Sequence, residues 1–250
     1  MPNSARRRLT ERGRSVHLAQ VNDTPPQSKA RPYDDAPTLP EGERVDPRDL
    51  VRGAWWEIEV GPGRGGFLFE RAQAAPEAGL VGLEVRRKWA SIVDARLARA
   101  GLGSRARVFA EDAKHALPRL GPDGVVLRVF LHFPDPWWKK RHTKRLVMGD
   151  AFLAEVARLL APGGELYVQT DVEERAAQYR EHIDACGWFE PWGDAPGDPR
   201  LADNPYGARS PREHRAIADG LPVYRMRYRR AAAARAHGSG GRGPSGEATA

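Results

Sequence analysis

The feature that most constrains the fold of this chain is a regular alternation of strand and helix patterns between residues 56 and 229. Short apolar runs that end at glycine or acidic residues predict strands, whereas apolar residues three or four positions apart predict helices. This alternation favours an α/β fold, with a mostly parallel sheet covered by helices on both faces. The predicted strands are residues 56–60, 80–84, 107–110, 125–131, 165–170 and 223–229, and the predicted helices are residues 66–75, 89–100, 146–160 and 172–186.

The two ends of the chain lack this alternation. Residues 1–44 are rich in arginine and proline and poor in apolar residues, which is typical of a disordered or loosely ordered extension. Residues 231–250 form a Gly/Ala/Ser-rich sequence with occasional arginines, which is typical of a flexible tail. We therefore predict a single folded domain over residues 45–230.

The charge and cysteine content limit the classes of partner and compartment. A net charge of +7 and a pI of about 9.8 favour polyanionic partners, of which nucleic acid is the commonest. Cys186 is the single cysteine, so we expect no internal disulfide and no cysteine-based zinc site, and nothing suggests another metal. The apolar runs are too short to span a membrane, and the arginine-rich N-terminus lacks the apolar stretch of a secretory signal. These features predict a cytoplasmic protein without a membrane partner.

A glycine-rich turn follows the first predicted strand. Gly61, Gly63 and Gly66 match the pattern G-x-G-x-x-G, whose glycines permit a tight turn and a close approach of a ligand to the backbone. In α/β sheets, ligands bind outside the carboxyl ends of the strands. The pattern therefore fits NAD, FAD or S-adenosylmethionine, although it also fits a turn without a ligand.

Three carboxylates lie in or just after the first three predicted strands. Glu84 ends the second strand, where a carboxylate can accept hydrogen bonds from both hydroxyls of a ribose. Asp112 follows the third strand, where it can accept the exocyclic amine of adenine or cap a helix. Glu59 lies inside the first strand and needs a partner, which the amino group of a methionine moiety would supply.

The segment HFPDPWWKKRHTKR, residues 132–145, follows the fourth predicted strand. Two prolines flank Asp135 and stiffen the chain, so that its carboxylate is held at the mouth of the sheet. Two tryptophans and a dense run of lysine and arginine come next. A rigid carboxylate, rings that stack on a base and cations that bind phosphates form a combination suited to RNA.

This segment resembles the hallmark of the bacterial tRNA (guanine-N7)-methyltransferases, in which FPDPW precedes a basic stretch. The resemblance runs from about residue 55 to residue 229. Thr170-Asp171-Val172-Glu173 is similar to the family's Thr-Asp segment after the fifth strand, and Ser210-Pro211-Arg212-Glu213 is similar to its late substrate motif. Arg212 stands where the family usually has an aromatic residue.

The resemblance implies a Rossmann-like class I methyltransferase fold with a seven-stranded sheet, and S-adenosylmethionine as the cofactor. It implies a tRNA substrate, methylated at guanine 46 of the variable loop, and either a monomer or a homodimer. The implied cofactor-binding residues are two glycines of the turn and four carboxylates. One of the carboxylates, Asp135, is also the implied catalytic residue. The implied residues are Glu59, Gly61, Gly63, Glu84, Asp112 and Asp135 for the cofactor, and Lys139, Asp171, Ser210, Arg212 and Glu213 for the substrate.

Guanine N7 has a free lone pair, so alignment of the reacting atoms is the main requirement. We expect Asp135 to stabilise the positive charge that develops on the ring. We expect Asp171 and Glu213 to accept the guanine N1–H and amino protons, and Lys139 to hold the tRNA backbone.

Three alternatives remain open from the sequence. The first is a class I methyltransferase that acts on an exocyclic amine of a base or on a protein side chain, although Pro-Asp-Pro-Trp differs from the Asn/Asp-Pro-Pro-aromatic sequence common in amine methylases. The second is a nicotinamide-dependent dehydrogenase, although no catalytic Tyr/Lys or His/Asp arrangement is evident. The third is a non-catalytic RNA-binding module on a methyltransferase fold.

Overall fold

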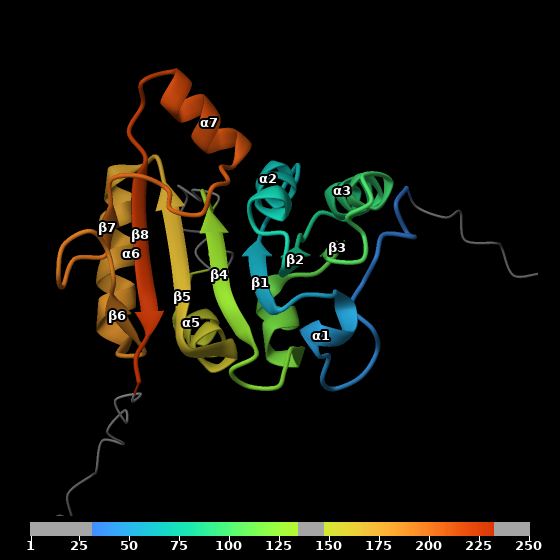
Figure 1. The fold of residues 1–250 in the computed structure, drawn as a ribbon. Coiled ribbons are helices and arrows are strands. Elements are labelled where there is room, and N and C mark those ends of the chain that lie inside the picture. Colours follow the sequence, from blue (N-terminus) through green and yellow to red (C-terminus); the bar gives the residue numbers. More distant parts are fainter. Residues whose placement is uncertain (1–31, 135–147, 233–250) are drawn as a thin grey trace, which may run out of the picture. The chain divides into compact units, whose positions relative to one another are not determined.

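The computed structural model describes residues 32–134 and 148–232, and an eight-stranded sheet organises this part of the chain (Figure 1). The strand order is β3-β2-β1-β4-β5-β8-β6, and the short β7 pairs with β8. Strands β1 to β5 are parallel to one another, whereas β8 is antiparallel to both β5 and β6. The mostly parallel sheet predicted from the sequence is thereby confirmed, with β7 as an addition. The strands are β1 (Trp55–Val60), β2 (Ala78–Leu83), β3 (Ala106–Phe109), β4 (Val126–His132), β5 (Leu160–Thr170), β6 (Phe189–Pro191), β7 (Arg200–Leu201) and β8 (Tyr224–Arg230).

Helices cover both faces of the sheet. Helices α4, α5 and α6 pack on one face against apolar side chains of the central strands. Helices α2 and α3 pack on the other face, where the segment 201–208 also lies against the sheet. None of the helices within the described ranges is long and apolar enough to cross a membrane. The helices are α1 (Pro47–Leu50), α2 (Gly66–Ala74), α3 (Arg87–Arg99), α4 (Ala113–Ala116), the 3-10 helix η1 (Leu117–Arg119), α5 (Asp150–Leu159), α6 (Glu173–Cys186) and α7 (Pro211–Ala218).

The central strands are apolar on one face and carry buried charged groups among aromatic rings on the other. In β1, Ile58 belongs to the main apolar core, while Glu57 and Glu59 point to the opposite face because successive side chains alternate. In β4, Arg128 and His132 share that polar face. Both glutamates are almost fully buried, and buried charges require partners. The contacts among the charged side chains on this face therefore show which polar atoms are already paired and which remain available to a ligand.

The folded domain begins earlier than the predicted boundary at residue 45. Residues 32–44 run beside β3, where the Ala110 amide donates to the Pro37 carbonyl at 2.6 Å and the Leu39 amide donates to Glu111 Oε1 at 2.9 Å. Leu39 is buried in the main core. This segment has no periodic pattern, so its single apolar contacts gave no signal in the sequence. The described part of the predicted N-terminal extension is thus part of the domain.

Candidate functional site

The glycine turn connects β1 to α2 at the carboxyl edge of the sheet. Gly61, Gly63 and Gly65 have φ values of 74°, 56° and 77°, a conformation that favours glycine. A Cβ placed on Gly61 would meet no atom within 4 Å, so this part of the turn borders open space. By contrast, a Cβ on Gly66 would lie 2.5 Å from Pro211 Cγ at the start of α7. Gly66, the last glycine of the pattern, therefore permits the docking of α7.

Glu84 follows β2 and fastens the glycine turn to the neighbouring strand. It is only 2% exposed. Its Oε2 accepts a hydrogen bond from the Gly63 amide at 2.9 Å, and its Oε1 accepts from the amide and Nε of Arg86 at 3.0 and 2.9 Å. These contacts orient the carboxylate beside the turn, at the position predicted for a ribose.

Glu59 and His132 form a buried pair across β1 and β4. Glu59 Oε1 lies 2.8 Å from His132 Nδ1, and both side chains are at most 3% exposed. Glu59 Oε2 and His132 Nε2 have no hydrogen-bond partner within the described residues. Burying a polar atom without a partner costs free energy, so such atoms indicate a ligand that would satisfy them. His132 was not predicted as a site residue, although a histidine that ends an apolar strand just before FPDPW was an available signal.

Asp112 follows β3 and caps α4. Its Oδ1 accepts a hydrogen bond from the Lys114 amide at 3.0 Å, in the usual geometry of an N-cap. The neighbouring Ala113 is buried against the core. The structure gives Asp112 the capping role, and its contact with adenine stays a prediction.

Asp171 and Arg212 form an ion pair at the carboxyl end of β5. Arg212 Nε lies 3.0 Å from Asp171 Oδ2 and Arg212 Nη2 lies 2.9 Å from Asp171 Oδ1, so that the contact is bidentate. The guanidinium carbon also lies 5.2 Å from the ring centroid of Phe133, within the range of a cation–π contact. Phe133 has a φ of 45°, a strained value for an aromatic residue, and strain of this kind occurs preferentially at functional sites.

Ser210 and Glu213 occupy the first turn of α7. Ser210 Oγ accepts a hydrogen bond from the Glu213 amide at 3.2 Å and so caps the helix. Glu213 is fully buried, and its Oε1 accepts from Nε and Nη2 of Arg225, both at 2.9 Å. Its Oε2 accepts from the side-chain amides of Asn204 at 3.0 Å and Gln169 at 3.2 Å.

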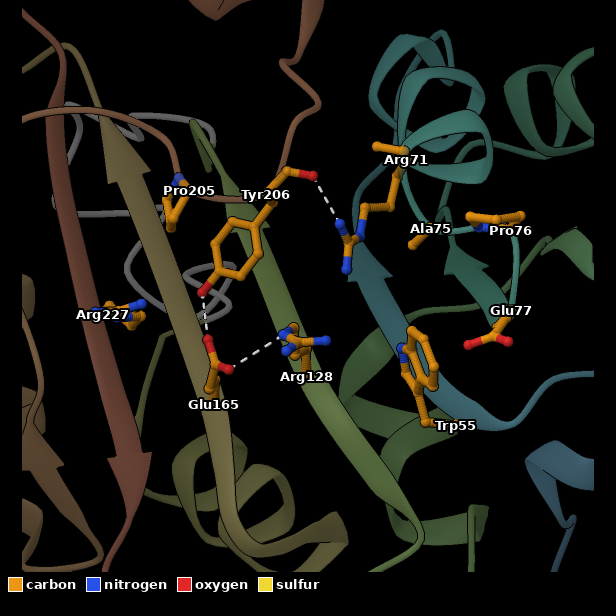
Figure 2. A pocket seen from close by; sticks show the side chains of 11 residues that line it. Trp55, Arg71, Ala75, Pro76, Glu77, Arg128, Glu165, Pro205, Tyr206 and Arg227 are labelled. Carbon is orange, nitrogen blue, oxygen red and sulfur yellow. Dashed lines mark hydrogen bonds and ion pairs between the residues drawn. The ribbon is translucent and has the colours of Figure 1, made fainter.

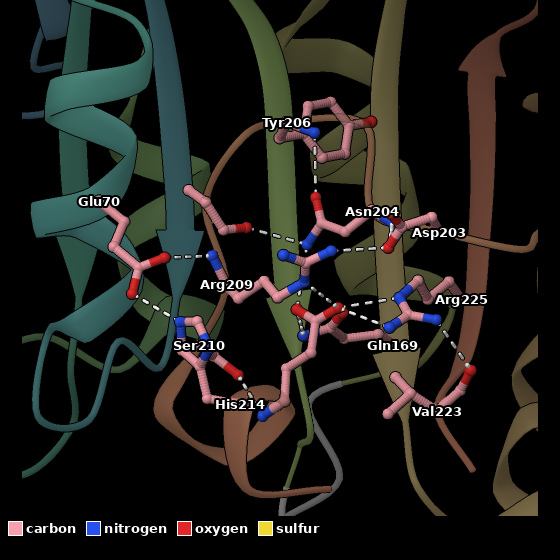
Figure 3. Close-up of polar contacts among 12 residues, drawn as sticks. Glu70, Gln169, Asp203, Asn204, Tyr206, Arg209, Ser210, His214, Val223 and Arg225 are labelled. Carbon is pink, nitrogen blue, oxygen red and sulfur yellow. Dashed lines mark hydrogen bonds and ion pairs between the residues drawn. The ribbon is translucent and has the colours of Figure 1, made fainter. Parts of the chain in front are cut away.

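Figure 3 shows Gln169, Asn204 and Arg225 pointing toward one another from different parts of the chain. Because both Glu213 oxygens are occupied, the structure gives this residue the role of holding α7 against β5 and β8. Burial and the nearby Glu213 carboxylate raise the pKa of Tyr167, whose hydroxyl donates to Gln169 Oε1 at 2.9 Å. A direct contact between Glu213 and a base stays a prediction.

A cavity of about 460 Å³ lies elsewhere, over the amino-terminal halves of β1, β4 and β5 (Figure 2). Three of its charged residues belong to one network, because Glu57 beside the cavity binds Arg71 at 2.7 Å and Arg128 at 2.8 Å, while Glu165 accepts hydrogen bonds from Arg128 and the Tyr206 hydroxyl. Burial alone would raise the pKa of Glu57, but the two arginines hold it below its ordinary value. This network stabilises the sheet and is separate from the glycine turn.

Two predicted site residues, Asp135 and Lys139, lie outside the described residues, as does the rest of the tryptophan-rich and basic segment up to residue 147. The described chain reaches Pro134, directly after the strained Phe133. The roles of Asp135 and Lys139 therefore stay predictions. The other predicted residues lie at the carboxyl ends of β1, β2, β3 and β5 or in the first turn of α7.

Comparison with known proteins identifies close relatives of the whole domain. Residues 55–226 match the model of the family described as "Putative methyltransferase". A tRNA (guanine-N(7)-)-methyltransferase of Anaeromyxobacter dehalogenans is 42% identical over 176 residues, which cover 70% of this chain and 85% of the relative. The enzyme of the same name from Myxococcus xanthus is 37% identical over 171 residues, which cover 68% and 81% of the two chains.

Solved structures agree in fold. The 16S rRNA methyltransferase KamB matches with a TM-score of 0.52 at 16% identity, covering 74% of this chain and 91% of its own. TrmN from Thermus thermophilus matches with a TM-score of 0.51 at 19% identity, covering 74% and 46%. At such low identity these likenesses support the methyltransferase fold alone. The family match and the identity to the two bacterial relatives go further, and they show that the chain belongs to the tRNA (guanine-N7)-methyltransferase family.

Proposed function

We propose that this protein transfers a methyl group from S-adenosylmethionine to N7 of a guanine in tRNA, at position 46 of the variable loop. The observation that carries the proposal is the buried Glu59–His132 pair, in which Glu59 Oε2 and His132 Nε2 have no partner within the described residues. Glu59 belongs to β1, which leads into the glycine turn, and His132 ends β4, which leads into the FPDPW segment. The names of the relatives supply the acceptor, a guanine N7 of tRNA.

The residues at the carboxyl edge fit the parts of S-adenosylmethionine. Glu84 is proposed to accept ribose hydroxyls with the lone pairs that its contacts to Gly63 and Arg86 leave free, and Gly61 leaves space beside the backbone. Glu59 Oε2 can accept hydrogen bonds from an amino group, and His132 Nε2 offers a second polar contact for the amino-acid part. Asp112 is proposed to contact the adenine. When bound, the cofactor supplies the activated methyl group.

The remaining groups would position the guanine and stabilise its charge. N7 carries a lone pair and no proton, so no residue has to remove a proton before the attack. The two oxygens of Asp171 can accept the N1–H and amino protons of guanine, which would distinguish guanine from adenine. Asp135 is proposed to stabilise the developing positive charge of the ring, and Lys139 to bind the tRNA backbone.

The proposed activity is compatible with either a monomer or a homodimer. The tRNA substrate is also compatible with the cytoplasmic location predicted from the sequence.

The test is incubation of the protein with methyl-labelled cofactor and unmodified tRNA, followed by nucleoside analysis. We expect 7-methylguanosine, and we expect the signal to disappear with tRNA in which guanine 46 is replaced by adenine. A different methylated nucleoside would support the alternative acceptors, and an absence of label in tRNA would refute the proposal.

The catalytic assignment is tested with Asp135→Ala. Loss of a charge that acts mainly in the transition state should lower kcat roughly 100-fold or more, while the cofactor Kd changes little. The matched control is Glu181→Ala, which removes a carboxylate from the exposed surface of α6 and should leave kcat unchanged. Unchanged turnover in the Asp135 variant would show that another group stabilises the charge.

A further inference from the structure

The edge of Arg212 that binds Asp171 has the same donor pattern as guanine. A guanidinium presents two parallel N–H groups to the two oxygens of a carboxylate, as the structure shows for Arg212 Nε and Nη2. Guanine presents N1–H and its exocyclic amine in the same side-by-side arrangement, whereas adenine has an acceptor at N1 and cannot form this pair. The Asp171 carboxylate is thus occupied by a side chain that presents donors as guanine does.

Arg212 also lies over the aromatic ring of Phe133, which offers a face for stacking. Its guanidinium lies 5.2 Å from the ring centroid of Phe133, and both guanidinium and nucleobases are planar groups that stack on aromatic rings. Arg212 therefore makes both contacts that a guanine at Asp171 would make, one at the edge and one at the face.

The Arg212–Asp171 pair is more exposed to solvent than the Arg225–Glu213 pair that holds the same helix. The Arg212 and Asp171 side chains are 40% and 19% exposed, whereas those of Arg225 and Glu213 are 8% and 0% exposed. Partly exposed pairs contribute little to stability, and a long arginine side chain can leave toward solvent. Helix α7 therefore has one fixed pair, formed by Glu213, and one replaceable pair, formed by Arg212.

We propose that Arg212 is a placeholder for guanine: its guanidinium occupies the Asp171 carboxylate until a base with the same two-donor edge displaces it. The proposal rests on the function proposed above and adds a displacement step to it. A base without two adjacent donors cannot take the place of Arg212 on Asp171, whereas guanine can. The residue that replaces the family's usual aromatic would thus lower the apparent affinity for guanine, while keeping the Asp171 carboxylate paired in the free protein.

The test measures the binding of GMP and AMP to the full chain by NMR titration, with the ratio of the AMP Kd to the GMP Kd as the readout. Both nucleotides carry the same phosphate charge, so a general effect of removing a cation cancels in this ratio. Because Arg212→Ala removes the competitor, the ratio should rise about two- to fivefold, the factor expected for a partly exposed ion pair. Asp171→Asn combined with Arg212→Ala should abolish this gain.

Arg200→Ala is the matched control, because Arg200 forms a similar pair with Asp198 on the surface, and it should leave the ratio unchanged. If mononucleotides bind too weakly to titrate, the KM for tRNA replaces the ratio, and Arg212→Ala should lower this KM by the same factor. An unchanged or smaller ratio of the AMP Kd to the GMP Kd, or a higher KM for tRNA, would overturn the proposed role of Arg212 as a placeholder. Since nucleotide binding needs no methyl transfer, a failure here leaves the formation of 7-methylguanosine as a separate test of the proposed function.

Discussion

Replacing Glu213 with glutamine separates a structural from a substrate-binding role for this residue. Glutamine keeps the shape of the side chain but removes its charge and turns one oxygen into an amide donor. In the structure, Oε1 faces two donors of Arg225 and Oε2 faces the amides of Asn204 and Gln169. Whichever way the new amide turns, it places a donor against donors.

The expected cost follows from the burial of the pair. Arg225 is 8% exposed at its side chain and loses its carboxylate partner without gaining access to water. Removing one member of a buried ion pair costs about 3–5 kcal/mol, and the oxygen that glutamine retains places this variant near the lower limit, about 3 kcal/mol. For a domain of this size, roughly 2–4 °C per kcal/mol gives a fall in Tm of about 6–12 °C.

Urea unfolding and thermal melting of wild type and Glu213→Gln measure this loss. The matched control is Glu190→Gln, because Glu190 pairs with Arg229 while both side chains are 49% exposed, and it should change the free energy of unfolding by less than about 1 kcal/mol. The double variant with Arg225→Gln should cost less than the sum of the single changes, because the unpaired charge is gone. If Glu213→Gln retains wild-type stability and loses activity, Glu213 does not hold α7 in place and direct contact with the substrate is favoured.

Three further predictions concern the glycine turn and the strand beneath it. Gly66→Ala should push Pro211, and with it the start of α7, away from α2 and lower activity more than stability, whereas Gly149→Ala, where a Cβ meets nothing within 4 Å, should have a small effect; equal activities would contradict this. Glu59→Gln should weaken cofactor binding about tenfold or more in calorimetry, since a charged acceptor is lost, while Glu57→Gln on the same face should reduce stability and leave the cofactor Kd nearly unchanged. Because the pKa of Glu57 is lower in the folded state than its ordinary value of 4.5, the stabilisation by its carboxylate is present above about pH 4.5 and is lost as the pH falls further. The difference in the free energy of unfolding between wild type and Glu57→Gln, measured by urea unfolding, should therefore shrink at acid pH, and a difference independent of pH would refute the assignment.

Local patterns were sufficient for the main elements of the fold. The predicted helix over residues 172–186 differs by one residue from α6, Glu173–Cys186, and the predicted strand over 56–60 differs by one residue from β1. Periodicity finds such elements because burial on one face repeats along the segment. It missed α7, β6 and β7 and the short helices α1, α4 and η1, since these elements are short or, like β7 with two residues, have no period to detect.

The candidate site shows a similar division. The turn at Gly61 and the carboxylate of Glu84 were predicted because residue type and position after a strand suffice to suggest a ligand site. The partners of Glu213 were not predicted, since a charged residue at the start of a helix gives no sign that it is fully buried. The same residue type can bind a ligand or hold the fold, and burial decides between these roles.

The sequence by itself determined the succession of the longer strands and helices, the glycine turn and the long FPDPW segment, because each depends on residues that are neighbours in the chain. Tertiary structure alone decided which side chains meet: Glu59 and His132 are 73 positions apart, and Asp171 and Arg212 are 41 positions apart. A bidentate contact needs two groups within about 3 Å in a defined orientation, which no spacing in sequence specifies. The folded sheet brings the carboxyl ends of β1 and β4 together, and the docking of α7 against Gly66 brings Arg212 to Asp171.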